Sequence, residues 1–262
     1  MISDLSELKR FLNRLGIQAK RSLSQNFLID GASIDKLIDS AHVTKDDTVL
    51  EIGPGPGALT EKLLQITPNV IAIELDRTFA KELPRLSPTP KVFEADALTF
   101  DYTSLPRLKV IASLPYHIAT PLILKLCALP NIDSITVIIQ KEVAMRFCAE
   151  PSTKPYGALT IQTQFLATPK MLFTLPPNSF YPPPKIDSAA IQFIPHSPPY
   201  DFSPEPFFDF VHKAFRQRRK MLKNTCPELA VPMETLGIPP TARAETLTLD
   251  QFAKLWQVVS SC

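Results

Sequence analysis

The sequence predicts an α/β fold whose mainly parallel sheet is buried between helices on both faces. Short apolar runs rich in β-branched residues, such as 70–73 and 135–139, alternate with longer segments of helical periodicity. Strands that are apolar throughout are typical of parallel sheets covered on both faces. A glycine-rich loop at 53–57 also connects one such run to a helical segment. Strand, glycine loop and helix in this order are typical of a doubly wound sheet.

Composition excludes several classes of protein. A chain of 262 residues is long enough for one large and one small domain. A net charge of +2 means that any binding of polyanions must come from local clusters of charge. The four cysteines show neither CxxC nor Cys/His spacing, so we expect reduced thiols, no metal site and a cytoplasmic location. Charged residues interrupt the segment 1–15, which argues against a signal peptide, and no apolar run approaches the roughly 20 residues that span a membrane.

The first 30 residues combine an amphipathic helix pattern with a polar and aromatic cluster. Leucines at helical spacing predict a short helix with a basic tail. The leucines are Leu5, Leu8, Leu12 and Leu15, and the basic residues are Lys9, Arg10, Arg14, Lys20 and Arg21. This segment is either a solvated leader or a contact for nucleic acid. The cluster 24–30 precedes a predicted helix over 33–41, and the Asn26-Phe27 pair within it ordinarily serves packing.

The glycine loop leaves two kinds of cofactor open. A β-branched strand is predicted at 48–52 and a helix at 59–66, and glycines between them permit a tight reversal and a close approach of the backbone to a ligand. The two matching sets are Gly53, Gly55 and Ala58 for a dinucleotide, and Glu51, Gly53, Gly55 and Gly57 for the acidic-x-Gly-x-Gly-x-Gly form of S-adenosylmethionine enzymes. A chance match without a binding function is the third alternative.

Two further carboxylates follow predicted strands. Glu74 ends the strand 70–73 and lies 21 residues after Gly53, where a carboxylate accepts hydrogen bonds from both hydroxyls of a ribose. Both kinds of cofactor carry a ribose, so Glu74 does not distinguish them. Asp96 follows a strand at 92–93 and is placed to accept from the amine of an adenine, although an Asp here also serves as a helix cap.

Residues 113–116 follow an apolar strand at 109–112 and precede a helix over 118–129. The Ser113 hydroxyl and the Leu114 carbonyl offer two hydrogen-bond acceptors, and Pro115 keeps the residue before it extended. The ring of Tyr116 adds a stacking face. Together they suit a flat heterocycle with an exocyclic amine, whereas the alternative is an ordinary turn stiffened by proline. An amine-accepting pair also favours S-adenosylmethionine over a hydride-transferring nicotinamide cofactor.

The middle of the chain predicts further strands around a proline-rich loop. The expected elements are a strand at 135–139, a helix over 141–149, and strands at 159–166 and 188–194. The loop 172–185 contains five prolines with Phe180 and Tyr181 among them. Because proline fixes φ, the loop can hold an exposed ring in one position. Such a ring either completes a stacking sandwich around a base or covers the sheet.

A second domain is expected after a proline-rich linker at 195–206. We therefore predict a first domain over 1–195 and a small helical domain over 196–262. The apolar face of its first helix consists of Phe208, Val211, Phe215 and Leu222, and the basic residues are Lys213, Arg216, Arg218, Arg219, Lys220 and Lys223. Only Asp209 opposes this charge in the sequence. The cluster is either a solvated face or a contact for a phosphate backbone, whose affinity falls steeply with salt.

Taken in order, these motifs resemble the ribosomal RNA small-subunit adenine dimethyltransferases, which use S-adenosylmethionine on a seven-stranded Rossmann-like fold. The resemblance covers nearly the whole chain. It rests on Ser24-Gln25-Asn26-Phe27-Leu28, Glu51-Ile52-Gly53-Pro54-Gly55-Pro56-Gly57, Glu74, Glu94-Ala95-Asp96-Ala97, Leu114-Pro115-Tyr116, Pro184-Lys185-Ile186-Asp187-Ser188, Ala214-Phe215-Arg216-Gln217-Arg218-Arg219-Lys220 and Arg243-Ala244-Glu245. The last three segments look more like the small-subunit enzymes than the related large-subunit methylases.

The resemblance implies roles for individual residues. S-adenosylmethionine would be bound by Asn26, Leu28, Gly53, Glu74, Asp96 and Ser113, without a metal. Catalysis would involve Ser113, Leu114, Pro115, Tyr116 and Phe180, and RNA would be bound by Arg216, Arg218, Arg219, Lys220 and Lys223. Ser113 stands where the family usually has Asn. A hydroxyl reaches less far than a carboxamide, but other amino-group methylases use Asp, Asn or Ser at this place.

The resemblance also implies a substrate and leaves rival functions open. The expected substrate is a pair of adjacent adenosines in the 3′-terminal hairpin of 16S rRNA, each dimethylated by a monomeric enzyme acting on an immature 30S subunit. A large-subunit adenine methylase is the nearest alternative. A non-catalytic assembly or transcription factor on the same fold is another, and the replacement of the usual Asn by Ser113 supports it. A nicotinamide reductase is a remote third.

Overall fold

The computed structural model describes residues 4–20, 25–198 and 200–260, so the predictions for Arg21, Ser24 and Cys262 lie outside the described residues. The chain divides into two compact units. The first contains Met1–Ala144 and Lys170–Pro195, and the second contains Met145–Pro169 and His196–Cys262. The segment 145–169, which the sequence pattern assigns to the first domain, therefore belongs to the second unit. It is held there by contacts such as the hydrogen bond from the Tyr156 hydroxyl to the Leu247 carbonyl, 2.6 Å long.

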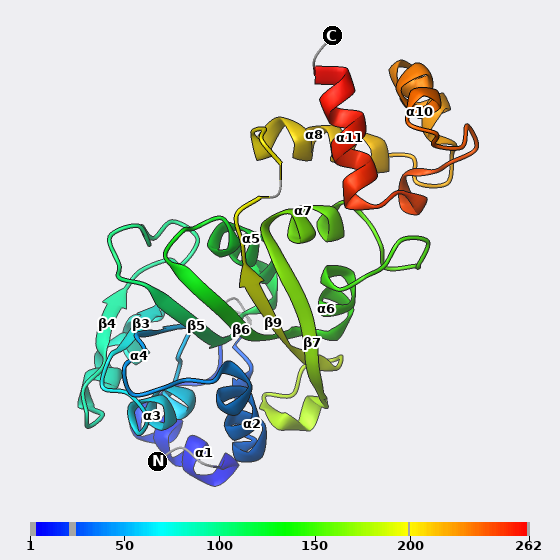
Figure 1. Cartoon of the computed structure of the whole chain (residues 1–262). Coiled ribbons are helices and arrows are strands. Elements are labelled where there is room, and N and C mark those ends of the chain that lie inside the picture. The colour runs from blue at the N-terminus through cyan, green and yellow to red at the C-terminus, as the bar shows by residue number, and fades with distance from the viewer. Residues whose placement is uncertain (1–3, 21–24, 199, 261–262) are drawn as a thin grey trace. The chain divides into compact units, whose positions relative to one another are not determined.

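A seven-stranded sheet organises the first unit, as Figure 1 shows. Its spatial order is β4 (Lys91–Glu94), β3 (Val70–Glu74), β2 (Val49–Ile52), β5 (Leu108–Ser113), β6 (Ile132–Gln140), β9 (Ser188–Pro195) and β7 (Ala167–Leu175). The strands from β4 to β6 are parallel to one another, and β9 is antiparallel to β6. The predicted α/β, Rossmann-like sheet of seven strands is confirmed.

Helices and a short ribbon surround this sheet. The helices of the first unit are α1 (Leu5–Leu15), α2 (Gly31–Ala41), α3 (Ala58–Leu64), α4 (Arg77–Glu82) with the 3-10 turn η2 (Leu83–Arg85), α5 (Tyr116–Cys127), the start of α6 (Lys141–Phe147) and the 3-10 turn η3 (Pro177–Ser179). The ribbon pairs β1 (Phe27–Leu28) with β8 (Phe180–Tyr181) in antiparallel register. Asp4 caps the start of α1 by accepting from the amides of Ser6 and Glu7 at 2.7 and 2.9 Å.

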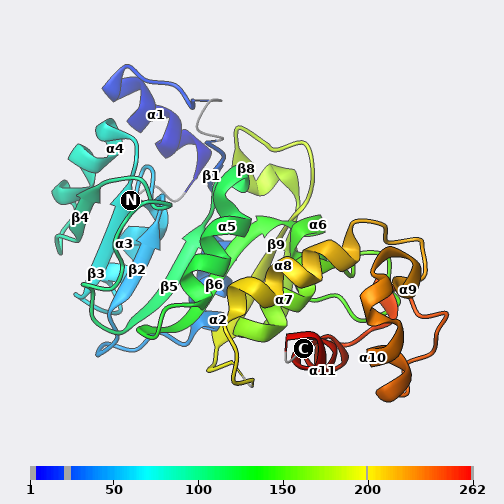
Figure 2. The same cartoon turned by 90° about the horizontal axis from the view of Figure 1, so that it is seen from above.

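Two apolar clusters connect these elements. The larger joins α2, α3, β5 and β6 through residues such as Ile34, Leu63 and Ile138, which are almost fully buried. A smaller cluster packs Leu8 and Leu12 of α1 against Phe79 of α4, and Figure 2 shows α1 lying beside α4. The amphipathic helix predicted at the start of the chain is therefore part of the folded unit, packed by its leucines.

The predicted strand at 159–166 is wrong, because these residues form helix α7 (Ala158–Leu166). Most of its side chains are buried, so apolar residues occur on several faces of the helix. The sequence therefore lacks the alternation of apolar and polar residues that identifies an amphipathic helix. Strand β7 follows directly and extends to Leu175, into the segment expected to be loop. The loop therefore begins after Leu175.

The second unit is helical in its C-terminal part, as predicted. Besides α7 it contains α8 (Pro204–Phe215), α9 (Leu222–Thr225), η4 (Pro227–Leu229), α10 (Ala230–Thr235), η5 (Ala244–Thr246) and α11 (Leu249–Ser260). Its interior is aromatic: the ring centroids of Phe165 and Phe207 lie 5.3 Å apart, and those of Phe215 and Phe252 lie 5.7 Å apart. No helix among the residues that the structure describes is long and apolar enough to cross a membrane.

The basic cluster does not lie on one continuous helix, contrary to the prediction. Helix α8 ends at Phe215, and residues 216–219 form turns before α9 begins at Leu222. The helix also buries Phe207, whereas Phe208 is only partly buried, so its apolar face is rotated from the predicted one. Five of the six basic residues therefore lie beyond α8, in the connecting segment and on α9.

Candidate functional site

The carboxyl ends of β2, β3, β4 and β5 meet at a cavity of about 220 Å³. The chain runs outward from β2 through β3 to β4 and then returns to β5 on the other side of β2. Ligands of doubly wound sheets bind at such a reversal of strand order. The cavity is lined by most of the predicted site residues, namely Asn26, Gly53, Glu74, Asp96, Ser113, Leu114, Pro115, Tyr116 and Phe180.

Leu28 is the exception among the predicted cofactor residues. It lines a smaller neighbouring cavity of about 50 Å³, together with Glu51, Gly53 and Ser113. The two cavities share Gly53 and Ser113 in their walls. Leu28 therefore lies beside the main cavity, and most of its side chain packs in the core.

The glycine loop follows β2, and two of its glycines line the cavity. Gly53 and Gly55 have φ values of +68° and +54°, a conformation that other residues seldom adopt. A Cβ atom at Gly55 would also lie 3.1 Å from the ring of Phe27. The backbone of the loop can approach a ligand closely because no side chain stands in the way.

Glu74 ties the loop to the end of β3. Its Oε2 accepts from the Gly55 amide at 2.9 Å and its Oε1 accepts from the Asp76 amide at 2.7 Å. Burial raises the pKa of Glu74, and the backbone hydrogen bonds from Asp76 and Gly55 oppose that rise only in part. A carboxylate has about four acceptor sites, so both oxygens can still accept a ligand hydroxyl.

Glu51 is a buried carboxyl group without a complete set of partners. It is 2% exposed, and among the described residues its Oε2 has no hydrogen-bond partner. Burial, and then the charge of Glu74, raise the pKa of Glu51 to about 8. A buried carboxyl beside a cavity fits a ligand with positive charge, because such a ligand would compensate the ionised form. S-adenosylmethionine, with a sulfonium and an ammonium group, has this chemistry.

Asp96 lies in the loop after β4 and is exposed at the cavity. Its Oδ1 accepts from the Leu98 amide at 2.8 Å, which forms a turn rather than the helix cap considered as an alternative. The loop is fixed from behind by Lys125, whose ammonium donates to the carbonyls of Leu98 and Phe100 at 2.8 and 2.9 Å. Asp96 lines the cavity, and its other carboxylate oxygen, which this turn does not use, can accept from a ligand amine.

Sequence reasoning missed Leu75 and the apolar residues Ala97 and Leu98 in the cavity wall. Leu75 directly follows Glu74, and its side chain is 54% exposed. An exposed large apolar side chain between a ribose acceptor and an amine acceptor suits the face of an adenine ring. The sequence could have indicated Leu75, because it is an apolar residue directly after the end of an apolar strand.

The other half of the cavity contains Ser113, the last residue of β5. Its hydroxyl makes no hydrogen bond within the described part of the chain, so both its donor and its acceptor capacity remain open. The Leu114 amide donates to the Ile138 carbonyl at 3.0 Å, which fixes the backbone just before Pro115. The acceptor positions predicted for a ligand amine are thus held by the sheet itself.

Tyr116 begins α5 and is partly buried at the cavity. Its hydroxyl is paired with the Ser188 hydroxyl at 2.7 Å. Burial raises the pKa of Tyr116, which keeps the phenol neutral at ordinary pH. The hydrogen bond to a fully buried partner on β9 holds the ring in one orientation.

Phe180 is not an exposed ring, contrary to the prediction. It is 3% exposed and packs in the larger core cluster with Leu28 and Ile34, while it also lines the cavity. The reason is its pairing with Leu28 across the β1–β8 ribbon, which places its side chain over the sheet. Phe180 therefore covers the core and also contacts the cavity, and its stacking on a base stays a prediction.

The basic residues of the second unit are more strongly paired than the sequence indicates. Arg218 contacts the Glu245 carboxylate and donates to the carbonyls of Lys154 and Thr153 at 2.7 and 3.0 Å. Lys213 is paired with Glu228. The prediction that only Asp209 opposes the cluster is therefore wrong, because these carboxylates are remote in sequence. Within the described residues, no ion pair involves Arg216, Arg219, Lys220 or Lys223.

No group of three or more His, Cys, Asp or Glu side chains that could hold a metal ion occurs in the described ranges. Cys127, Cys148 and Cys226 form no disulfide within the described residues, and burial raises the pKa of Cys127 to about 12. None of these cysteines lines the cavity.

The motifs and their geometry agree with a known family. A family model described as ribosomal RNA adenine dimethylase matches residues 16–260. The chain belongs to this family. Members similar to it include the ribosomal RNA small subunit methyltransferase A of Protochlamydia amoebophila, 40% identical over 98% of this chain and 96% of the relative. The protein of the same name from Chlamydia trachomatis serovar L2 is 38% identical over 98% of each chain.

Solved structures support the same family assignment. A dimethyladenosine transferase from Plasmodium falciparum superposes with a TM-score of 0.79 at 25% identity, over 90% of this chain and 98% of that one. The 23S rRNA methyltransferase ErmE gives a TM-score of 0.71 at 25% identity, over 90% of this chain and all of that one. The predicted family, fold and enzyme class of this ribosomal RNA adenine dimethylase are confirmed.

Proposed function

We propose that the protein transfers methyl groups from S-adenosylmethionine to the 6-amino groups of two adjacent adenosines in the 3′-terminal hairpin of 16S rRNA. One observation carries the proposal: a single cavity is lined both by Glu74 and Asp96, which suit an adenosine-bearing donor, and by Ser113 and Tyr116, which suit a second purine. Relatives at 38–40% identity over nearly the whole chain are named small subunit methyltransferase A. We also propose that the protein acts as a cytoplasmic monomer on an immature 30S subunit.

The donor half of the cavity is built by β2, β3 and β4. Glu74 would accept from the ribose hydroxyls, Asp96 from the adenine amine, and Leu75 would cover the ring. Glu51 and the backbone of Gly53 would face the charged methionine end, with Asn26 and Leu28 beside it. When bound, the donor supplies a methyl group activated by the positive sulfur.

The acceptor half has the simpler task of holding an amine in line with that methyl group. The 6-amino lone pair of adenine is delocalised into the ring and is a poor nucleophile. Hydrogen bonds from the amine to the Ser113 hydroxyl and the Leu114 carbonyl would favour a pyramidal nitrogen and free the lone pair. The Ser113 hydroxyl has no competing partner in the described chain, so it is available to accept from the amine.

Positioning provides most of the rate enhancement in this scheme. Correct alignment of two reactants can lower the barrier by roughly 7 to 11 kcal/mol, so no strong base is needed before transfer. The target base must leave its stack, and contact with the rings of Tyr116 and Phe180 would offset about 1 to 3 kcal/mol of that cost. The phenol of Tyr116 is held by Ser188, so the ring is ordered before the base arrives.

The proposal is tested by incubating the protein with methyl-labelled S-adenosylmethionine and ribosomal subunits that lack the modification. We expect label in dimethyladenosine of the small-subunit RNA, mapped by primer extension to two adjacent positions. Label only in the large-subunit RNA would assign the protein to the large-subunit methylases. Donor binding without transfer to either RNA would favour a non-catalytic assembly factor and overturn the proposal.

We further propose that Arg216, Arg219, Lys220 and Lys223 contact RNA, whereas Arg218 mainly fixes the fold of its own unit. Each phosphate contact contributes about one unit to the slope of log affinity against log salt concentration. Replacing Arg219 and Lys220 by Ser should therefore weaken RNA binding and lower this slope by about 2. An unchanged slope would identify the cluster as a solvated face. Arg218→Ser should instead lower thermal stability, because it loses Glu245 and two carbonyl partners.

A further inference from the structure

The ribbon strand β8 presents two aromatic rings to two different spaces. Phe180 pairs with Leu28 and Tyr181 pairs with Phe27 across the ribbon. Successive side chains of a strand point to opposite faces. Phe180 accordingly lines the cavity described above, whereas Tyr181 lines a separate groove.

This groove has a volume of about 1050 Å³, and the described residues that line it include parts of α1, residues 17–19 and the segment 181–186. It shares Gln25, Asn26 and Tyr116 with the cavity. The groove and the cavity are therefore adjacent.

The lining of the groove is cationic, amide-rich and aromatic. The described residues in its wall include no Asp or Glu side chain. The cations, amides and rings are Lys9, Lys185, Asn13, Gln18, Gln25, Asn26, Gln140, Tyr116 and Tyr181. Lysines attract phosphate, amides match the edges of bases, and rings stack on base faces.

The ring of Tyr181 is held in place before any ligand binds. It packs against the cluster of Leu8, Leu12 and Phe79, and the Lys9 ammonium lies 5.5 Å from its centroid. Lys185 is exposed and makes no ion pair within the described residues. A fixed ring in a groove that also contains Lys9 and Lys185 is suited to a base flanked by phosphates.

We propose that this groove binds the nucleotide next to the target adenosine, with its base against Tyr181 and its phosphates near Lys9 and Lys185. The inference rests on the proposed function, since it places one nucleotide in the cavity and its neighbour in the groove. An RNA strand is favoured over an acidic protein segment because the groove and the cavity share a wall, and one continuous chain can then fill both. The two spaces would hold two adjacent adenosines side by side, one reacting and one stacked.

The test combines a protein change with an RNA change. Small subunits are reconstituted with 16S rRNA whose 3′ hairpin has an abasic ribose on the 5′ or the 3′ side of the target adenosine. RNA binding and methyl transfer are measured for the wild type, Tyr181→Leu, which keeps apolar packing, and the matched control Tyr181→Phe, which keeps the ring.

We expect Tyr181→Leu to raise Kd and KM for the RNA by about 5- to 100-fold, with the affinity for S-adenosylmethionine unchanged. Tyr181→Phe should resemble the wild type. One abasic substitution should weaken wild-type binding by the same factor and should add nothing to Tyr181→Leu, because both remove the same stacking contact. Additive losses, or an RNA affinity unaffected by Tyr181→Leu, would overturn the proposal.

Two controls keep the test decisive. A lower affinity of Tyr181→Leu for S-adenosylmethionine would mean that its fold is disturbed. The exposed Lys185 is then replaced by Ser instead, and the salt dependence of RNA binding is measured. A slope equal to that of the wild type would overturn the proposal. If the wild type binds RNA but transfers no methyl group, the proposed function fails. In that case, RNA binding by the Tyr181 variants and the abasic RNAs still tests the role of the groove.

Discussion

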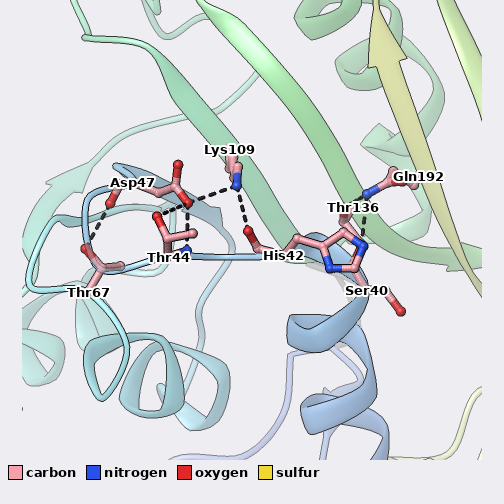
Figure 3. Close-up of polar contacts among 8 residues, drawn as sticks. All are labelled: Ser40, His42, Thr44, Asp47, Thr67, Lys109, Thr136 and Gln192. Atoms are coloured by element: carbon pink, nitrogen blue, oxygen red, sulfur yellow. Dashed lines mark hydrogen bonds and ion pairs between the residues drawn. The ribbon is translucent and has the colours of Figure 1, made fainter.

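The two ends of the same sheet use polar residues in opposite ways. At the amino ends of β2 and β5, the Lys109 ammonium donates to Asp47 Oδ2 at 2.9 Å and to the His42 carbonyl at 2.7 Å, as Figure 3 shows. Asp47 also accepts from the amide and hydroxyl of Thr44, and its carbonyl accepts from the Thr67 hydroxyl at 2.8 Å. The polar groups of this network satisfy one another within the protein.

At the carboxyl ends the polar groups are left incomplete. Within the described chain, Glu51 Oε2 and the Ser113 hydroxyl have no hydrogen-bond partner, and Glu74 uses its oxygens on only two backbone amides. Unpaired buried polar groups reduce stability unless a ligand pairs them. The amino end is therefore built for stability and the carboxyl end for binding, and substitutions at the two ends should affect different measurements.

The largest expected effect is the pH dependence caused by Glu51. Its folded pKa of about 8 lies above the ordinary value of 4.5, so the wild type loses stability as pH rises from about 4.5 to about 8. The loss is about 1.4 kcal/mol per pH unit within this window. Glu51→Gln should remove that loss, so its stability relative to the wild type should increase with pH over the same range. Urea unfolding at several pH values measures this, and a constant difference would contradict it.

The second effect concerns donor binding through Glu74. Glu74→Ala removes a charged acceptor that binds the Gly55 and Asp76 amides and faces the cavity. Hydrogen bonds to charged groups contribute about 1.5 to 3 kcal/mol, so the affinity for S-adenosylmethionine should fall by roughly 10- to 100-fold. Isothermal titration calorimetry gives the dissociation constant. An affinity equal to that of the wild type would remove Glu74 from the ribose.

The third effect separates catalysis from donor binding. Tyr116→Leu and Phe180→Leu should lower methyl transfer by about 5- to 100-fold through loss of a stacking ring, while the affinity for the donor persists. Ser188→Ala keeps both rings and only releases the Tyr116 hydroxyl, so it should lower transfer less than Tyr116→Leu does. Equal losses of transfer and donor affinity would show that these rings serve the core alone.

The last effect is confined to the amino end. Lys109→Met should lower the free energy of unfolding by about 1 to 3 kcal/mol and leave donor affinity unchanged, because Asp47 and the His42 carbonyl lose their donor. Lys45→Met in the exposed preceding loop is the control and should change neither quantity. A loss of donor affinity in Lys109→Met would contradict the division between the two ends.

The same network predicts a response to acid. Burial raises the pKa of Asp47, but the hydrogen bonds from Lys109 and Thr44 outweigh it, so the pKa lies below its ordinary value. Asp47 thus stabilises the fold above the pKa it has when unfolded, and this contribution is lost as pH falls through the lower folded value. The free energy of unfolding that is lost on acidification should therefore be smaller in Lys109→Met than in the wild type.

Local signals made most of the site predictable. The glycine loop, Glu74 at the end of an apolar strand and Leu114-Pro115-Tyr116 each depend on a few consecutive residues, and parallel strands bring their carboxyl ends to one edge. What failed depends on remote partners. Phe180 is buried because it pairs with Leu28, and Arg218 is engaged by Glu245 and by carbonyls of the segment 145–169. Periodicity carries no information about such contacts.

Helix α7 illustrates a second limit. Its side chains are buried on most faces, so the sequence shows an apolar run that suits a strand as well as a helix. Its assignment to the second unit depends on the rings of Phe207 and Phe208, which pack against Phe165 from the other side of the linker.

The central claim is tested most directly by a crystal structure of the protein with S-adenosylmethionine bound. We expect the ribose hydroxyls on Glu74, the adenine amine near Asp96, and the sulfonium methyl facing an open space between Ser113 and Tyr116. A donor bound elsewhere, or a space beside Tyr116 too small for a purine, would contradict the claim.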